Sequence, residues 1–419
     1  MNHPNPAGQR SRFWQNFRRQ KGAFRAWRLL QFMIFIAVFA DFLANDKPLY
    51  CKIDGTHYFP ILKQYTVDLG LSAWPADFVT RRWKEQDYQK AIWPPIPYAA
   101  QTIDLKNSGF ISPFARQRTN KLSERHWLGT DQLGRDLAAG LIAGTRVALL
   151  VGLVAMAIAG SIGLLLGAGA GYFGDSRLRI HPLPAILGII SNSWIIYYWL
   201  VSRTYDLLEG RLINNLLMAL LCGTLVTGSL YILTRTLQKR GQLQHGWAVP
   251  IDALVLRLIE IVSALPGLML ILGVIALIKN PTIYHVMIII GLISWTGIAR
   301  FARAEMIKIR SLEYIQAAQV LGFSDGYIII KHALPNILNP IIISLSFGMA
   351  GAVLLEAFLS FLGLGLGAES VSWGSLLNMA RSNVAAWWMA IFPGLAIFLL
   401  VFTFNLIGEG LNKALERAD

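Results

Sequence analysis

Runs of apolar residues, each about 20 residues long, recur along the 419-residue chain and are separated by shorter polar segments. A helix of that length spans the roughly 30 Å hydrocarbon core of a bilayer and satisfies its own backbone hydrogen bonds there. The pattern therefore predicts an all-α polytopic membrane protein with about eight transmembrane helices. The expected spans are residues 29–44, 145–172, 183–201, 212–233, 254–278, 283–302, 337–359 and 387–407.

Composition and charge agree with a membrane protein. Hydrophobic residues make up 54% of the chain and charged residues only 15%, too few to cover a soluble domain of this size. The formal net charge of +14 would suggest nucleic acid as a partner of a soluble protein. Here the basic residues cluster beside apolar runs, as the positive-inside rule predicts for cytoplasmic flanks. We therefore expect contact with the lipid bilayer and none with nucleic acid.

The charge pattern also orders the segments. Residues 1–28 hold seven Lys or Arg and no acidic residue, which places the N-terminus in the cytoplasm. An even number of spans then returns the C-terminus to the same side. The expected division is a basic cytoplasmic N-terminus (1–28), a first transmembrane helix (29–44), an extracytoplasmic segment (45–138), a helical core (139–176 and 250–415) with a cytoplasmic loop (303–336), and a transmembrane hairpin (177–249) between the two parts of the core.

Two local features predict how the spans pack and bend. Gly163, Gly167 and Gly171 recur every four residues and so share one helix face, where a neighbouring helix can approach closely. Glycine is also common in membrane helices in general, and that is the alternative explanation. Pro266 predicts a kink in the span at 254–278.

The sequence lacks the motifs for ATP hydrolysis and for a metal site. It contains no GxxxxGK[ST] loop to hold ATP phosphates, no HExxH, and no Cys/His cluster at metal spacing. Residues 169–174 match the dinucleotide fingerprint formally, but they end a membrane span with no strand before them. We therefore expect that the chain is not an enzyme and that it holds no cofactor or metal.

Residues 314–336 predict a short helix, a turn and a second helix between two spans. Gly322 suits the C-cap of the first helix, Ser324 suits the N-cap of the second, and Pro335 is expected to stop or kink the chain after it. Two alanines near the end of the first helix would give it an exposed face without large side chains, which can enter a partner's cleft. Taken alone, the segment is also compatible with an ordinary cytoplasmic loop.

The whole string resembles the ATPase-docking ("EAA") loop of ABC-importer permeases. Ala317-Ala318-x₃-Gly322-x-Ser324 is followed by His332-x-Leu334-Pro335-Asn336, and Gln316 stands where that family has its namesake glutamate. By this resemblance the ATPase-docking residues are Tyr314, Gln316, Ala317, Ala318, Leu321, Gly322, Ser324, His332, Leu334 and Pro335.

Other stretches are similar to the dipeptide and oligopeptide branch of that family. His332 replaces an isoleucine found in many permeases, and residues 127–136 and 359–411 resemble stretches of the same branch. Residues 44–65 resemble the subgroup that includes permeases for microcin C. The hairpin at 177–249 is an insertion, since the family has only a short cytoplasmic link there.

The resemblance implies a fold, a role and a set of partners. The fold would be a six-helix type I importer core plus an inserted two-helix hairpin. The chain would be a permease subunit of the bacterial inner membrane, with both termini in the cytoplasm, that forms half of a translocation pathway for peptides. Its partners would be a second permease subunit, two ABC ATPase subunits that hold ATP and magnesium, and an extracytoplasmic peptide-binding protein.

Glu356 is the acidic residue that lies deepest in an expected span. An ionised group there is costly and faces protein or water, so Glu356 either lines the translocation pathway or pairs with another helix. The alternative to an ATP-driven importer is a self-contained ion- or proton-coupled secondary transporter. That class needs intramembrane charges and broken helices at matching places in two halves, and the sequence shows no internal repeat.

Overall fold

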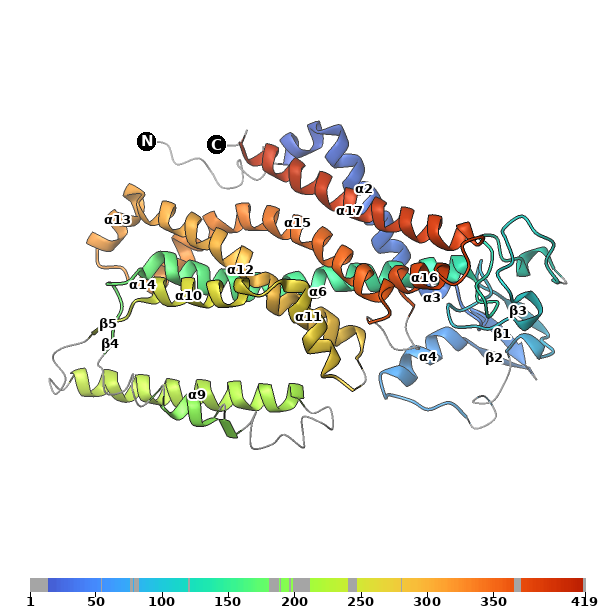
Figure 1. Cartoon of the computed structure of the whole chain (residues 1–419), viewed down its shortest axis with the longest axis horizontal. Coiled ribbons are helices and arrows are strands. Elements are labelled where there is room, and N and C mark those ends of the chain that lie inside the picture. Colours follow the sequence, from blue (N-terminus) through green and yellow to red (C-terminus); the bar gives the residue numbers. More distant parts are fainter. Residues whose placement is uncertain are drawn as a thin grey trace. The chain divides into compact units, whose positions relative to one another are not determined.

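The computed structural model consists of long helices and small antiparallel sheets (Figure 1). It describes residues 14–53, 55–75, 78, 83–119, 121–180, 188, 190–195, 197–198, 212–239, 247–279, 281–364 and 371–416. Contacts divide the chain into two compact units, the first within Met1–Met156, Thr282–Ile290 and Ile343–Asp419 and the second within Ala157–Pro281 and Gly291–Ile342.

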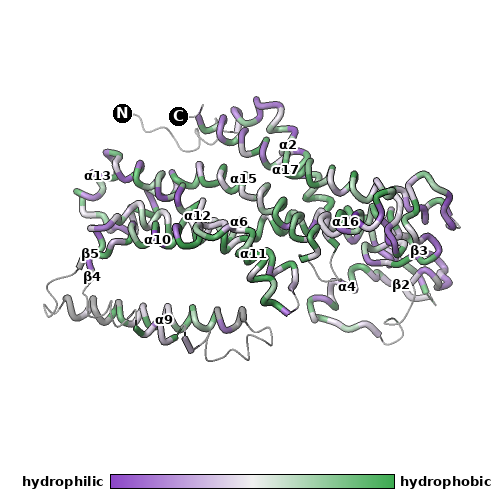
Figure 2. Tube along the Cα trace, in the orientation of Figure 1, coloured by the Kyte–Doolittle hydropathy of each residue, from purple (hydrophilic) through white to green (hydrophobic). Residues whose placement is uncertain are grey.

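Four helices in the described part of the chain are long and apolar enough to cross a membrane. They are α6 (Leu137–Phe173), α12 (Ile283–Arg310), the run Asp325–Phe361 that ends in α15 (Leu334–Phe361), and α17 (Trp387–Glu416). Green, the colour of hydrophobic residues, predominates along much of these helices in Figure 2. They confirm an all-α polytopic membrane protein, and each contains one of the expected spans.

A fifth apolar span is broken. Helices α10 (Ile251–Ala264) and α11 (Gly267–Ala276) are bent by 75° and make one span only if the pair is counted together. Pro266 lies at the break, where a kink was expected, and Leu265 before it is extended, with φ −95° and ψ 137°. Proline pushes the preceding residue out of the helical region, so the helix ends there.

The N-terminal helix differs from an uninterrupted apolar span. At 29–44 the structure has the end of α2 (Lys21–Val38) and the short α3 (Ala40–Leu43), with a break at Phe39. Helix α2 is 18 residues long and carries three basic residues in its first half, so it does not meet the apolarity of the four long spans.

The inserted hairpin is described only in part. Most of its first expected span, 183–201, lies outside the described residues. The second, 212–233, lies within α9 (Leu212–Lys239), in which residues 217–230 are apolar. The described part of the chain therefore holds four or five spans, and the total of about eight stays a prediction.

Residues 45–138, expected to be polar and extracytoplasmic, contain a small sheet. β1 (Tyr50–Ile53) pairs antiparallel with both β2 (Thr56–Tyr58) and β3 (Lys90–Ile92). Cys51 and Ile53 form a buried cluster with Trp83, and other aromatic side chains pack against it. Around this sheet hydrophilic residues are frequent (Figure 2). Helix α4 (Pro60–Asp68) and the 3₁₀ turns η1 (Trp83–Glu85), η2 (Leu105–Asn107) and η3 (Leu122–Glu124) complete the segment.

In the first unit, α17 packs against α2 and against α16 (Trp373–Ala380). Gln20 donates from Nε2 to the carbonyl oxygen of Gly410 at 3.1 Å. A Cβ added at Gly410 would lie 2.2 Å from the Cβ of Ala23, so only glycine fits at this position. The helix at the start of the chain is therefore held directly against the helix at its end.

In the second unit, the glycine stripe of α6 lies against the backbone of α12. A Cβ added at any of the three glycines would come closer to a carbonyl oxygen of α12 than real Cβ atoms do. The distances would be 2.8 Å from Gly163 to Trp295 O, 2.3 Å from Gly167 to Ala299 O, and 2.7 Å from Gly171 to Arg303 O. The carbonyls recur every four residues, like the glycines, which confirms the predicted packing surface.

Replacing Gly167 by alanine should destabilise the protein, because the methyl group would overlap the Ala299 carbonyl. Overpacking of this kind costs roughly 1–3 kcal/mol. Gly169→Ala is the matched control, since a Cβ there has no neighbour within 4 Å. Thermal unfolding in detergent should show a lower Tm for Gly167→Ala than for Gly169→Ala, and equal Tm values would contradict the close packing.

Candidate functional site

The segment that resembles the docking loop folds into short helices, which follow the membrane-spanning α12 and lie in the second unit. We name residues 313–336 the docking loop. It consists of α13 (Glu313–Val320), a turn, α14 (Asp325–Tyr327), the π-helix η5 (Ile328–Ala333) and the start of α15.

Gly322 closes the first helix as expected. Its φ is +80°, in the left-handed region where glycine carries no steric cost. Phe323 N donates to Ala318 O at 3.2 Å and Gly322 N donates to Gln319 O at 3.0 Å. This pair of bonds is a Schellman motif, which satisfies carbonyls that the helix end leaves without partners.

Ser324 caps the second helix, also as expected, because its side-chain oxygen accepts from Tyr327 N. Pro335 does not stop the helix, because the helical run continues from Asp325 to Phe361; the kink stays a prediction. Pro335 lies in the first turn of α15, directly after the π-helix η5. Inside a continuous run proline removes one backbone hydrogen bond, and the π-helix directly before Pro335 marks this local departure from α-helical bonding.

The predicted docking residues differ in exposure. Tyr314, Gln316, Ala317, Leu321, Gly322, Ser324 and Pro335 are exposed, His332 and Leu334 are half-buried, and Ala318 is buried. The expectation that both alanines lie on an exposed face therefore holds for Ala317 and is wrong for Ala318, which is 7% exposed. Consecutive helical residues point about 100° apart, so one of the pair faces inward.

Exposed apolar side chains that the motif did not single out surround Gly322. Val320 is 88% exposed and Leu321 75%, and Phe323 and Tyr327 are also exposed, with their rings stacked at 5.2 Å between centroids. We name these four residues the apolar rim. Apolar residues in a loop next to basic flanks were the sequence signal that would have found them.

The inner side of the docking loop is anchored. Ile315, Ile328 and Ile337 are fully buried. Asn336 donates from Nδ2 to the hydroxyl oxygen of Tyr314 at 3.0 Å and to a backbone carbonyl of the loop at 2.7 Å. The loop thus has a fixed backbone and a free outer face, which is what a preformed docking surface needs.

Glu356 does not line an open path in this structure. Its side chain lies in α15, is 1% exposed, and accepts a hydrogen bond from Ser360 Oγ at 2.7 Å. Ser360 is one helical turn further on, so the bond is local. This contact supports a structural role for Glu356, and the role in a translocation pathway stays a prediction.

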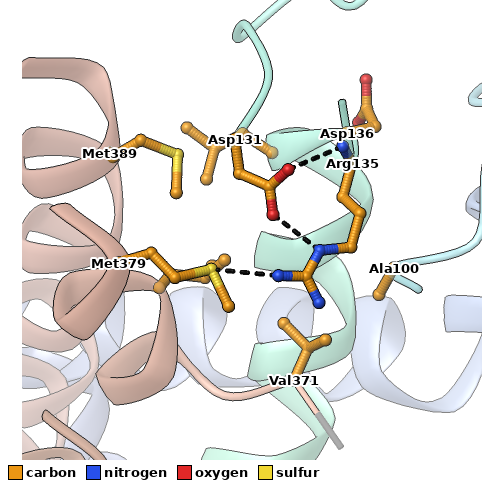
Figure 3. A pocket seen from close by; sticks show the side chains of 9 residues that line it. Ala100, Asp131, Arg135, Asp136, Val371, Met379 and Met389 are labelled. Carbon is orange, nitrogen blue, oxygen red and sulfur yellow. Dashed lines mark hydrogen bonds and ion pairs between the residues drawn. The ribbon is translucent and has the colours of Figure 1, made fainter. Parts of the chain in front are cut away.

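The stretch at 127–136 has a structural role in the first unit (Figure 3). Asp131 accepts from the Arg135 backbone N at 2.8 Å and from Arg135 Nε at 2.6 Å, and Arg135 Nη2 contacts Met379 Sδ at 3.3 Å. The cavity beside them measures about 10 Å³. A single water needs at least that much space, so no substrate fits there.

His126 supports the same stretch from within. It is fully buried, with Nδ1 2.8 Å from an Asp136 carboxylate oxygen and Nε2 3.3 Å from one of Asp104. Burial alone would raise the pKa of Asp104, but hydrogen bonds from Asn107 and His126 outweigh it and hold that pKa below its ordinary value. Asp136 also accepts from Ala139 N at 2.8 Å, in the first turn of α6. Among the described residues, no His, Cys, Asp and Glu side chains form a metal-binding group.

Comparison with known proteins places the docking loop in a wider context. Residues 247–418 match the family described as "Binding-protein-dependent transport system inner membrane component", and this match contains the whole loop. This part of the chain is therefore similar to that family. The resemblance to ABC-importer permeases is therefore confirmed, as is a multi-pass location in the inner membrane.

Individual permeases match over most of the chain. The inner membrane ABC transporter permease protein YejE of Escherichia coli (strain K12) is 28% identical over 96% of this chain and 95% of its own length. The peptidoglycan transport system permease protein YejE of Agrobacterium fabrum is 25% identical over 97% of this chain and 92% of its own length. The dipeptide transport system permease protein DppC of Alkalihalophilus pseudofirmus is 29% identical over 74% of this chain and 78% of its own length.

If Glu356 is structural in this permease, its shape should matter more than its charge. Glu356→Gln can still accept the Ser360 hydrogen bond and should leave the Tm nearly unchanged, whereas Glu356→Ala leaves Ser360 without its partner and opens a cavity. Deleting a buried side chain of this size costs roughly 2–4 kcal/mol. Thermal unfolding of the two variants checks this, and a large loss of Tm in Glu356→Gln would show that the charge itself is required.

Proposed function

We propose that this permease is the membrane subunit of an ATP-driven peptide importer and that an ATPase subunit docks on its docking loop. The observation that carries the proposal is the apolar rim around Gly322, which is exposed on a loop whose inner side is buried and capped. Contiguous apolar residues on an anchored loop mark a protein-binding surface. The short turn at Gly322, without a side chain, leaves room for the partner to approach.

Peptides are the proposed cargo. The support is that relatives matching most of the chain are named as permeases for dipeptides and for peptidoglycan. At 25–29% identity, these names indicate a substrate class rather than a particular peptide.

The proposed assembly contains this permease, a second permease subunit, two ABC ATPase subunits that carry ATP and magnesium, and an extracytoplasmic peptide-binding protein. In this arrangement residues 1–28, the docking loop and the C-terminus lie in the cytoplasm, and residues 45–138 lie outside. The permease itself performs no chemistry. It supplies a pathway with two accessible states, and the partners select between these states because each binds them with different affinity.

Replacing Gly322 by tryptophan should abolish the stimulation of ATP hydrolysis by the assembled complex. A Cβ added at this position meets no atom of the chain within 4 Å, so we expect the indole to project into the space proposed for the ATPase. Gly70→Trp is the matched control, because Gly70 also has a positive φ (+70°) and open surroundings but lies in the segment expected outside. Both variants carry a similar backbone strain of roughly 1–2 kcal/mol.

The measurements are ATPase rate in vesicles and co-purification of the ATPase with the permease. We expect Gly322→Trp to lose both and Gly70→Trp to retain both. An unchanged ATPase rate in Gly322→Trp would refute docking at this position.

The body of the inserted segment should be dispensable for transport. β4 (Arg179–Ile180) and β5 (Trp247–Ala248) pair antiparallel, with Ile180 opposite Trp247. Residues 181–246 can therefore be replaced by an Asn-Gly turn, which suits a two-residue hairpin. We expect the shortened permease to assemble and to import peptide at a rate near that of the full chain. Loss of import in a complex that still assembles would show that the insert takes part in transport.

The rival function, a self-contained secondary transporter, predicts a different result. It requires substrate movement by the purified permease alone, driven by an ion or proton gradient and without ATP. Such activity in vesicles would overturn the importer proposal.

A further inference from the structure

The inserted segment begins and ends at one place in the second unit. The two strands at its ends form a short ribbon, extended by a hydrogen bond from Val249 N to Leu178 O at 2.9 Å. Next to this ribbon, Asp175 Oδ1 accepts from Ala253 N at 3.0 Å, in the first turn of α10. The segment that leaves α6 (residues 175–180) is thus hydrogen-bonded to the segment that enters α10 (residues 247–253), and we name these two segments the base of the insert.

Arg177 in this base contacts the docking loop. Its Nη2 lies 3.2 Å from Asp325 Oδ1, in a pair whose side chains are 29% and 44% exposed. With the amide of Gln319 oriented so that its oxygen faces the guanidinium, that oxygen accepts from both Nη1 and Nη2 at 3.2 Å. Gln319 belongs to α13 and Asp325 to α14, so one side chain bridges the two helices on either side of Gly322.

The same group also reaches the end of α6. The Arg177 guanidinium lies over the ring of Tyr172 at 4.6 Å from its centroid, and the Tyr172 hydroxyl donates to Asp325 Oδ1 at 2.7 Å. Arg310, at the end of α12, donates to the carbonyl oxygen of Tyr172 at 3.0 Å. The docking loop is therefore tied to α6 through Asp325, with Arg177 and Tyr172 sharing the carboxylate.

Arginine suits this position better than lysine does. Its planar guanidinium can stack on an aromatic ring while its N–H groups donate to a carboxylate and an amide at once. A lysine ammonium is a single point charge and can keep the Asp325 pair but not the whole arrangement. The contacts of Arg177 thus depend on the geometry of the fork as well as on its charge.

We propose that Arg177 is a positioning residue for energy coupling: from the base of the insert it holds the two halves of the docking loop together and ties them to α6. The inference rests on the proposed docking function. A displacement of the loop by the ATPase is then passed to α6 as the movement of one body. Without Arg177, the loop still binds the ATPase, but its movement is only partly transmitted.

The experiment uses the complete transporter in vesicles and measures peptide uptake per ATP hydrolysed. Arg177→Ala should lower this ratio about three- to tenfold, the range expected when a partly exposed pair in a small network is lost, while the ATPase still co-purifies. Arg177→Lys should fall between Arg177→Ala and the wild type. Arg179→Ala is the matched control, since Arg179 lies two residues away and is not part of the contacts of Arg177 with Asp325, Gln319 and Tyr172.

A charge exchange separates positioning from simple packing. Arg177→Asp and Asp325→Arg should each lower the ratio, and the double variant should recover at least half of the loss. A wild-type ratio in Arg177→Ala, or a double variant no better than its single parents, overturns the role of Arg177. If the wild-type complex hydrolyses ATP without moving peptide, the proposed function itself fails and this inference fails with it.

Discussion

The close approach of α6 and α12 is the contact on which the second unit depends. Lipid is as apolar as the helix surfaces, so no hydrophobic force drives helices together there, and association depends on packing. Because Gly163, Gly167 and Gly171 have no side chains, the backbone of α6 lies against the carbonyls of α12 over about two helical turns. Because α12 ends just before the docking loop, this backbone contact also fixes where the loop starts.

The docking loop combines a stiff inner side with an open outer one. Caps at Gly322 and Ser324 satisfy backbone groups at the two helix ends, and three isoleucines hold the loop from below. The outer side exposes apolar side chains on a backbone that does not need to change conformation when a partner binds. A partner that binds such a surface loses little conformational entropy, so more of its binding energy is available to shift the equilibrium between states.

The parts of this structure that the sequence predicted are those decided within a few residues. Gly322 and Ser324 were identifiable because helix caps depend on local backbone geometry. Ala318 was misjudged because its burial depends on which side of α13 faces the protein. The sheet in residues 45–138 was missed because its strands are three or four residues long and β3 joins β1 across a long loop. The contact between Arg177 and Asp325 joins distant parts of the chain, and no pattern near either residue indicates it.

The ribbon at the base of the insert makes this part of the permease tolerant of evolutionary and engineered change. The two ends of the insert are neighbours, because Ile180 and Trp247 face each other in paired strands. The entropic cost of closing a loop between them rises only slowly with the length of the loop. Segments of different lengths can therefore be exchanged between Ile180 and Trp247 while α6 and α10 keep their places. A fluorescent domain grafted there would lie next to the docking loop. If the ATPase carried an acceptor dye, binding of the ATPase would be measured as energy transfer from this domain to the dye.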